Sequence, residues 1–224
     1  MEEKKFNKLN RTFARRIGKK LSNLNKNLLE FALPKYIYAP EKLIGTKYKK
    51  IFLEVGFGMG EHFIHQVTSN PEYLYIGAEV YLNGVANVLK KIEATNFMIW
   101  ADDLDEILEK MPVDVLDGIY ILFPDPWHKK RYLKKRLFNA ERLLSFKETL
   151  KNDGFIAFAS DIDDYFLEAC KFLEKDSDFT VEHKDFTIPH EGYVQTKYHR
   201  KAIGEGRLAQ FVEAKFTKQN QKQK

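Results

Sequence analysis

Short apolar runs alternate with amphipathic stretches from position 51 onward. The apolar runs are nearly continuous, as expected for strands that are buried on both faces of a sheet; they cover residues 51–55, 73–80, 97–100, 115–123 and 155–160. The stretches between them have the apolar spacing of helices, and they cover residues 61–69, 82–93, 103–110 and 136–151. This alternation predicts an α/β fold with a mostly parallel sheet and helices on both faces.

The two ends of the chain follow different patterns. Residues 7–31 combine many Lys and Arg with apolar residues at mostly helical spacing, until Pro34 and Pro40 break the pattern. Near the other end, 179–188 and 207–216 predict two strands around a loop. We therefore expect seven strands, five or six of them parallel and the last reversed by a C-terminal hairpin. The predicted organisation is a basic arm or cap at 1–50, one globular domain at 51–217 and a polar tail at 218–224.

The composition indicates an ordinary globular chain. Of the 224 residues, 44% are hydrophobic and 14% aromatic, which excludes a disordered protein. The single cysteine, Cys170, excludes a disulfide framework and a cysteine-built zinc site, and we expect no metal. No apolar run approaches membrane-spanning length and the first residues are polar and basic. A cytoplasmic location without membrane contact is the simplest expectation.

The charge is unevenly distributed along the chain. Residues 1–50 contain 14 Lys and Arg against 4 Asp and Glu, whereas residues 51–224 contain 23 against 28. This asymmetry predicts that the N-terminal part contacts a polyanion such as a nucleic acid. A merely solvated segment stays open as an alternative, because Lys outnumbers Arg by 29 to 8 throughout.

A glycine-rich turn follows the first predicted strand. Its spacing is GxGxG, at Gly56, Gly58 and Gly60, with Glu54 two residues before the first glycine. The dinucleotide fingerprint needs its third glycine at position 61, where this chain has Glu61. A pyrophosphate is poorly served by the nearby acid, whereas a sulfonium cofactor with a charged amino group tolerates it. The turn therefore favours S-adenosylmethionine, and an NAD-dependent oxidoreductase is a distant alternative.

Two further carboxylates follow the next two predicted strands. Glu79 is placed to accept hydrogen bonds from both hydroxyls of an adenosine ribose, and Asp102 is placed to meet the adenine edge. A single strand-end carboxylate is more often a helix N-cap. Three of them beside a glycine turn favour a ligand, because ligands bind at the carboxyl ends of such strands. This arrangement is typical of S-adenosylmethionine-dependent methyltransferases.

The sharpest motif, Phe123-Pro-Asp-Pro-Trp127, follows the fourth predicted strand. Its two prolines stiffen the backbone around Asp125. Trp127 could stack on a base or cap the pocket, and His128 could be a base or a hydrogen-bond donor. Residues 128–136, HKKRYLKKR, hold six Lys and Arg in nine positions. Their place beside the expected methyl donor favours phosphate contact over a solvated face.

Together these segments resemble the bacterial tRNA (guanine-N7)-methyltransferases. The resemblance covers most of residues 50–200 and rests on LEVGFGMGEH (53–62), YIGAEVYLNGV (75–85), FPDPWHKKR (123–131), FASDIDDY (158–165) and TKYHR (196–200). It implies a Rossmann-like class I methyltransferase fold. It also implies methyl transfer from S-adenosylmethionine to guanine N7, at position 46 in the variable loop of tRNA.

The resemblance also assigns site residues. It implies that four acids contact the cofactor: Glu54, Glu79, Asp102 and Asp125. Asp125 is in addition the expected catalytic residue. Six positions are implied to contact the tRNA: Lys129, Asp161, Thr196, Lys197, Tyr198 and His199. The family usually has TKFE or TKYE, so His199 departs from it and its role stays open. The run after Arg200, KAIGEGR, matches less well and is expected to be helix-poor.

Two other functions stay open at this point. One is a different RNA or small-molecule methyltransferase, because the fold alone does not separate these. The other is a nucleic-acid-binding module with a vestigial pocket, against which the intact pairing of Glu54 with its glycines argues. The sequence does not decide between a monomer and a homodimer.

Overall fold

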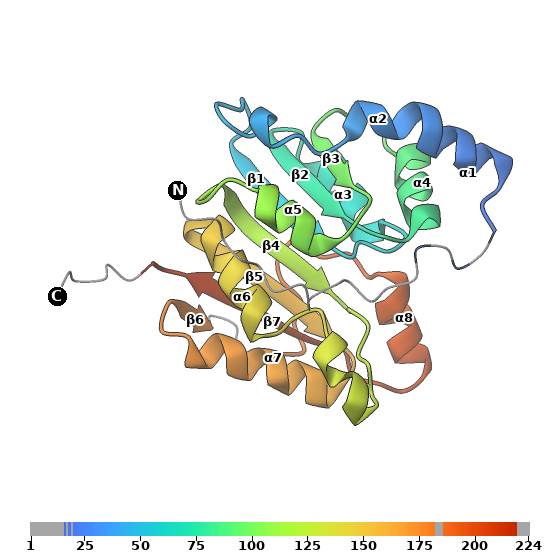
Figure 1. Ribbon diagram of the computed structural model, residues 1–224. Helices are drawn as coiled ribbons and strands as arrows, with labels where there is room; N and C mark the ends of the chain where they lie inside the picture. Colours follow the sequence, from blue (N-terminus) through green and yellow to red (C-terminus); the bar gives the residue numbers. More distant parts are fainter. Residues whose placement is uncertain (1–15, 17, 19, 182–185, 219–224) are drawn as a thin grey trace.

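The computed structural model describes residues 16, 18, 20–181 and 186–218. Its centre is a seven-stranded sheet in the order β3-β2-β1-β4-β5-β7-β6 (Figure 1). The strands are β1 (Lys50–Val55), β2 (Tyr73–Ala78), β3 (Phe97–Trp100), β4 (Leu116–Leu122), β5 (Leu150–Ser160), β6 (Phe179–Val181) and β7 (Gln210–Phe216). The first five pair in parallel, and β7 lies between β5 and β6, antiparallel to both. The predicted mostly parallel sheet with a reversed C-terminal strand is confirmed.

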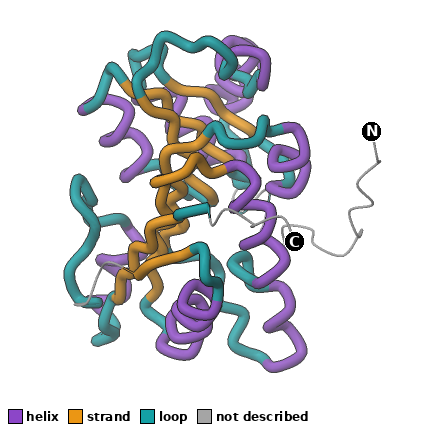
Figure 2. The backbone as a smooth tube through the Cα atoms, turned by 90° about the vertical axis from the view of Figure 1, so that its left-hand side faces the viewer, coloured by secondary structure: helices purple, strands orange, loops and turns teal. Residues whose placement is uncertain are grey.

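Helices cover both faces of the sheet, as the edge view in Figure 2 shows. One face packs against α5 (Leu104–Lys110), α6 (Ala140–Thr149) and α7 (Asp163–Lys175). The other packs against α3 (Glu61–Ser69) and α4 (Leu82–Lys91). Side chains alternate between the two faces along each strand: Leu53 is buried on the first face and Phe52 on the second. Because of this alternation, neighbouring side chains at the end of a strand lie on opposite faces of the sheet.

The N-terminal segment stays helical past the expected break. It forms α1 (Asn23–Asn27), the π-helical turn η1 (Leu28–Ala32) and α2 (Leu33–Tyr36), followed by the 3₁₀ turn η2 (Pro40–Lys42). The predicted break at Pro34 is wrong because this proline lies in the first turn of α2, where an N–H has no helical partner. Residues 7–15, 17 and 19 of the helix predicted at 7–31 lie outside the described residues.

The C-terminal part also differs from the sequence prediction. α8 (Lys197–Gly204) occupies the run that was expected to be helix-poor, so β6 and β7 do not form a simple hairpin. This helix begins at Thr196, whose Oγ1 accepts a hydrogen bond from the N–H of His199 at 3.2 Å. The helix α7 was not predicted. Among the described residues, no helix is long and apolar enough to cross a membrane.

The helix predicted at 136–151 starts later than expected. Residues Lys130–Lys135 form a separate 3₁₀ turn, η3. Asn139 then caps α6, its Oδ1 accepting a hydrogen bond from the N–H of Arg142 at 3.0 Å. The cationic run therefore lies on a short surface turn between β4 and α6.

Candidate functional site

A cavity of about 470 Å³ lies at the carboxyl ends of the central parallel strands. Its wall consists of the glycine turn after β1, the end of β2, the residues after β3 and the loop after β4. Lys197 and Tyr198, at the start of α8, close one side. Because the carboxyl ends of parallel strands meet at one edge, segments far apart in the sequence converge here.

The glycine turn needs its glycines for two different reasons. Gly56, Gly58 and Gly60 all have left-handed backbones, with φ of 69°, 56° and 78°. Gly56 and Gly58 line the cavity, and a Cβ at Gly56 would meet no atom within 4 Å. Gly60 is not in the cavity wall. Its Cβ would overlap the side chain of Val88, so this glycine packs the turn against α4.

Glu79 directly follows β2 and presents a buried carboxylate to the cavity, with 7% of the residue exposed. Its Oε2 accepts a hydrogen bond from the N–H of Gly58 at 2.6 Å, and its Oε1 accepts one from Tyr81 at 2.7 Å. Burial raises the pKa of Glu79 from 4.5 to about 7, against the backbone N–H groups of Tyr81, Gly58 and Val80, which lower it. Each oxygen has a further lone pair with which it can bind a hydroxyl.

Asp102 lies in the cavity wall after β3, as predicted. Its carboxylate pairs with the guanidinium of Arg16 at 3.1 Å. Arg16 also donates to the carbonyl of Ala101 at 3.3 Å, and its own carbonyl accepts from the N–H of Leu82 at 2.9 Å. The basic N-terminal segment thus reaches the cavity, where Gly18 also contributes to the wall.

The loop after β4 holds Asp125 at the cavity between two unusual backbone conformations. Phe123 and Trp127 have φ of 53° and 46°, the left-handed region that non-glycine residues rarely adopt. Such a conformation costs about 1–3 kcal/mol and persists only where surrounding contacts enforce it. Asp125 and Trp127 both line the cavity. The sequence predicted the stiffness from the prolines but not the left-handed residues.

Arg136 supplies one of the enforcing contacts. Its side chain is 3% exposed, and its Nε donates to the carbonyl of Pro126 at 2.9 Å. Its other nitrogens donate to Asp164 at 2.6 Å and Glu168 at 2.7 Å, both on α7. Arg136 therefore anchors the loop to α7. This corrects its grouping with the phosphate-contacting cations of the 128–136 run.

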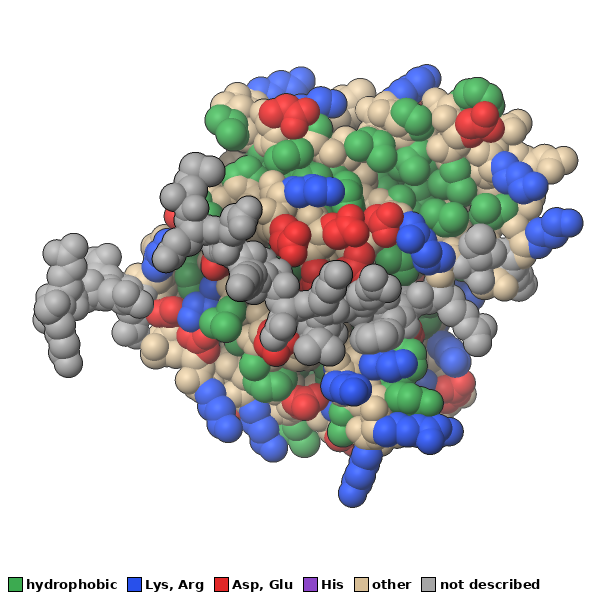
Figure 3. Space-filling view, viewed as in Figure 1, with side chains coloured by type: hydrophobic (Ala, Val, Ile, Leu, Met, Phe, Trp, Pro, Cys, Tyr) green, Lys and Arg blue, Asp and Glu red, His purple; other side chains and the backbone are tan. Residues whose placement is uncertain are grey.

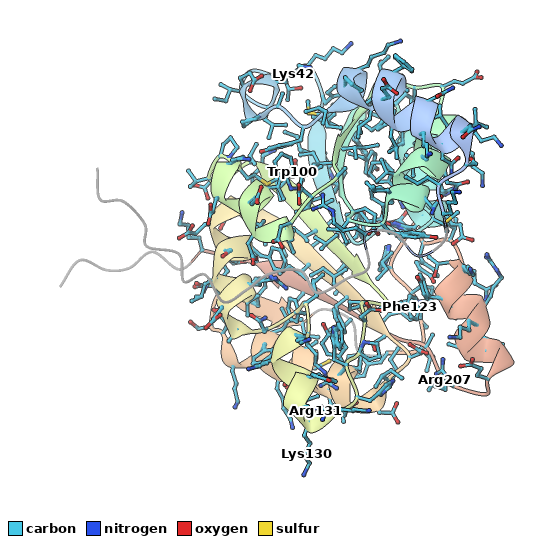
Figure 4. The ribbon with its side chains drawn as sticks, turned by 45° about the vertical axis from the view of Figure 1, so that its right-hand side comes forward. Lys42, Trp100, Phe123, Lys130, Arg131 and Arg207 are labelled. Carbon is cyan, nitrogen blue, oxygen red and sulfur yellow. The ribbon has the colours of Figure 1, made fainter. Side chains whose placement is uncertain are left out.

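Four other cations of that run are exposed, whereas Lys135 is half-buried and lines the cavity. Lys129, Lys130, Arg131 and Lys134 form no ion pair with any described residue. In Figure 4 Lys130 extends away from the ribbon, and in Figure 3 Lys and Arg side chains gather at the lower edge of the face, below acidic ones. The cations of α8 differ, because Arg200 pairs with Glu61 at 2.6 Å. The turn η3 is thus a cationic edge beside the cavity.

The positions implied to contact tRNA divide into two groups. Lys197 and Tyr198 line the cavity, and Thr196 holds them there by capping α8. Asp161 does not line the cavity. Its carboxylate pairs instead with Arg207 at 2.7 Å. Lys129 is exposed outside the cavity, at the start of η3.

His199 is turned toward the protein interior and is not part of the cavity wall. Its ring stacks on Phe123 with centroids 5.6 Å apart, and its Nδ1 lies 2.9 Å from the hydroxyl of Tyr193. Burial lowers the pKa of His199. The imidazole therefore supports the loop that carries Asp125 from beneath.

Glu54 is not among the residues that line the cavity, and its contact with the cofactor stays a prediction. The preceding and following residues of β1 face α5 and α6, so Glu54 faces α3 on the other side of the sheet. Its carboxylate is 4% exposed and lies 2.8 Å from Nδ1 of His62.

Sequence reasoning missed several wall residues, namely Met59, Tyr81, Leu104, Lys135, Leu137 and Arg142. Tyr81 directly follows a strand end that was predicted, and Leu104 lies in the first turn of the helix predicted at 103–110, so their positions were available as a signal. Arg142 comes from α6, and only the fold brings it to the site. Within the described residues no cluster of His, Cys, Asp and Glu could hold a metal.

The known proteins to which this chain is similar are methyltransferases. A family model described as "Putative methyltransferase" matches residues 48–211. The bifunctional methyltransferase of Rickettsia felis is 55% identical over 91% of this chain and 39% of its own length. The chain thus spans about two fifths of the length of the bifunctional relatives. The tRNA (guanine-N(7)-)-methyltransferase of Rhodopseudomonas palustris is 36% identical over 89% of this chain and 85% of its own.

Solved structures show the same fold at low sequence identity. The 16S rRNA methyltransferase KamB has a TM-score of 0.58 at 13% identity, covering 80% of this chain and 92% of its own. The precorrin-6y C5,15-methyltransferase of Geobacter metallireducens has a TM-score of 0.52 at 19% identity, covering 79% and 84%. These proteins act on different substrates, so the likeness extends to the fold and not to the target.

Proposed function

The chain belongs to the family of bacterial tRNA (guanine-N7)-methyltransferases, and from this premise we propose that it methylates N7 of a guanine in tRNA, at position 46 of the variable loop. The observation that carries the proposal is the placement of Asp125. Its carboxylate lies in the wall of the cavity, on an anchored loop that leads directly into the cationic turn η3. A base at the cavity and phosphates along η3 can thus be bound at the same time.

The cavity fits S-adenosylmethionine as the methyl donor. Glu79 offers two carboxylate oxygens to ribose hydroxyls, and the missing side chain at Gly56 leaves open space beside the backbone. Asp102 lies in the same wall, where it would meet the adenine edge. When bound, the cofactor supplies an electrophilic methyl group on a sulfonium. Glu54 also belongs to the proposed set, and its carboxylate would then be shared between the cofactor and His62 on α3.

The residues of the chain mainly position the guanine. N7 carries an in-plane lone pair and no proton, so its attack on the methyl carbon requires no general base. Asp125 would accept hydrogen bonds from the N1 and N2 edge of the base and aim N7 at the methyl group. Positioning of this kind supplies about 7–11 kcal/mol of barrier reduction. The negative charge of Asp125 also stabilises the positive charge that develops on the methylated ring.

The turn η3 and the start of α8 would bind the tRNA around this base. Exposed Lys129, Lys130 and Arg131 are suited to phosphates, which supply most of the sequence-independent affinity for nucleic acids. Lys197 and Tyr198 also line the cavity. Trp127 sits between η3 and Asp125 in the wall, where it can stack on the base or cap the cavity.

Incubation with labelled S-adenosylmethionine and unmodified tRNA tests the proposal. Borohydride and aniline should cleave the product at one variable-loop guanine, as expected of an N7-methylated base. Asp125→Asn keeps the shape but loses the charge and one acceptor, so turnover should fall by roughly 10²-fold or more. Cofactor binding should change much less. A methylated product that resists this cleavage would refute the N7 target, and a fully active Asp125→Asn enzyme would refute the role of the carboxylate.

A further inference from the structure

A chain of buried polar side chains starts at Glu54 and ends in the segment that leads to α8. Glu54 Oε2 lies 2.8 Å from Nδ1 of His62, and Nε2 of His62 lies 3.2 Å from Nε2 of His190. Glu54 and His62 are 4% and 1% exposed. Burying a carboxylate and an imidazole is unfavourable unless they bind each other. Two apolar side chains would fill the same space without this cost, so we looked for a role of the pair other than filling the core.

Gln66, one turn along α3, fixes the direction of the hydrogen bonds. Its Oε1 accepts from the hydroxyl of Tyr75 at 3.1 Å, so its amide nitrogen faces Gly192 and His62. Nδ1 of His62 carries the proton that Glu54 binds, so Glu54 selects the tautomer of His62. Nε2 of His62 then has one lone pair, which can accept from only one of its two neighbours, His190 and Gln66. Because Gln66 donates to the carbonyl of Gly192, we assign the hydrogen bond at Nε2 of His62 to His190.

The helix α3 also binds residues further along the segment that leads from His190 to α8. Gln66 donates to the carbonyl of Gly192 at 2.9 Å, and Glu61 accepts from the backbone N–H of Lys197 at 2.7 Å. Residues of α3 therefore hold His190, Gly192 and Lys197, which lead into the part of α8 that lines the cavity. Because α3 directly follows the glycine turn, it links the two sides of the cavity.

We propose that Glu54, His62 and His190 are positioning residues for the tRNA-binding start of α8. Glu54 fixes the tautomer of His62, His62 binds His190, and the segment 190–196 then sets Lys197 and Tyr198 at the cavity wall. Glu54 thereby also acts on the tRNA side of the reaction. This inference rests on the proposed function.

The test separates tRNA from cofactor in four variants. Glu54→Gln and His190→Phe should each raise the KM for tRNA about tenfold, the loss of roughly one hydrogen bond to a charged group. In His190→Phe the Kd for S-adenosylmethionine from calorimetry should stay within about twofold of the wild-type value. The double variant should be no worse than either single one, because both break one chain. His190→Gln keeps an N–H donor and should restore most of the tRNA affinity.

His65→Phe is the matched control, because His65 lies on the same helix outside the chain. It should leave both constants unchanged. Weakened cofactor binding in Glu54→Gln with an unchanged KM for tRNA would overturn the proposal, as would equal effects of His190→Phe and His190→Gln. If Glu54→Gln fails to fold, the two His190 variants decide.

Failure of the proposed function gives a different result. A wild-type protein that does not methylate tRNA would refute that function. The positioning role is then tested by amide hydrogen exchange at Lys197 and Tyr198, which should be faster in His190→Phe than in the wild type and in His65→Phe. Unchanged exchange would overturn the positioning role by itself.

Discussion

Replacement of Glu79 by Gln removes a buried carboxyl group that titrates near neutral pH. Burial raises its pKa from 4.5 to about 7. Ribose hydroxyls are donors, so the ionised form should bind S-adenosylmethionine and the protonated form should not. The affinity of the wild type should then fall about tenfold from pH 8 to pH 6, since one unit below its pKa a group is about 90% protonated. Glu79→Gln should bind more weakly at pH 8 and show little dependence on pH.

The same group makes folding depend on pH. Between pH 4.5 and 7 the folded protein holds a proton that the unfolded chain has lost, so stability falls as the pH rises through this window. At about 1.4 kcal/mol per pKa unit, the loss between pH 5 and pH 8 is about 2–3 kcal/mol. Urea unfolding of wild type and Glu79→Gln at both pH values measures the difference.

Calorimetric titration with S-adenosylmethionine in buffers of different ionisation enthalpy counts the protons released. A wild-type affinity that stays constant from pH 6 to pH 8 would refute the reasoning. So would the same pH dependence in Glu79→Gln, because the titrating group would then lie elsewhere.

Three further variants test the surroundings of the cavity. Replacing Lys129, Lys130 and Arg131 with Ala should weaken tRNA binding and leave the affinity for the cofactor unchanged. The slope of log K for tRNA against log salt concentration should flatten by about 0.7–0.9 for each lost phosphate contact. A slope equal to that of the wild type would contradict this prediction. Arg136→Gln should instead leave the salt dependence unchanged, lower the free energy of unfolding by about 1.5–3 kcal/mol and slow turnover, since it releases the loop of Asp125. Gly84→Ala places a Cβ on the carbonyl oxygen of Gly58, so chemical denaturation should show a loss of about 1–3 kcal/mol and calorimetry a weaker binding of S-adenosylmethionine.

Much of the fold was predictable because strands of a buried parallel sheet consist of continuous apolar runs in the sequence. The run at 51–55 became β1, and the helical spacing at 61–69 became α3 with the same bounds. The spacing also placed Glu79, Asp102 and Asp125 at strand ends, and the structure brings all three to one cavity. These successes follow from local periodicity together with the geometry of parallel sheets.

The direction of Glu54 was not predictable in the same way. A strand buried on both faces has apolar residues at every other position on both sides, so the pattern of 51–55 does not tell which face an acid meets. His62, the partner of this acid, gave no signal in the sequence, because only the fold buries its ring between α3 and the sheet, against Tyr120. The ionic partners of Arg136 lie on α7, a helix that was not predicted.

The place of β7 bears on the order in which the protein can be completed during synthesis. This strand comes last along the described chain, yet it pairs with β5 over Phe155–Ser160 and carries β6 on its other edge. While the ribosome is still adding residues 161–209, the edge of β5 exposes unpaired N–H and C=O groups, as unprotected strand edges do. His199 and Arg207, which support the cavity loop and Asp161, also emerge in this late interval. Until Phe216 has left the exit tunnel, the unpaired edge of β5 in a nascent chain can therefore bind chaperones or pair with other nascent chains.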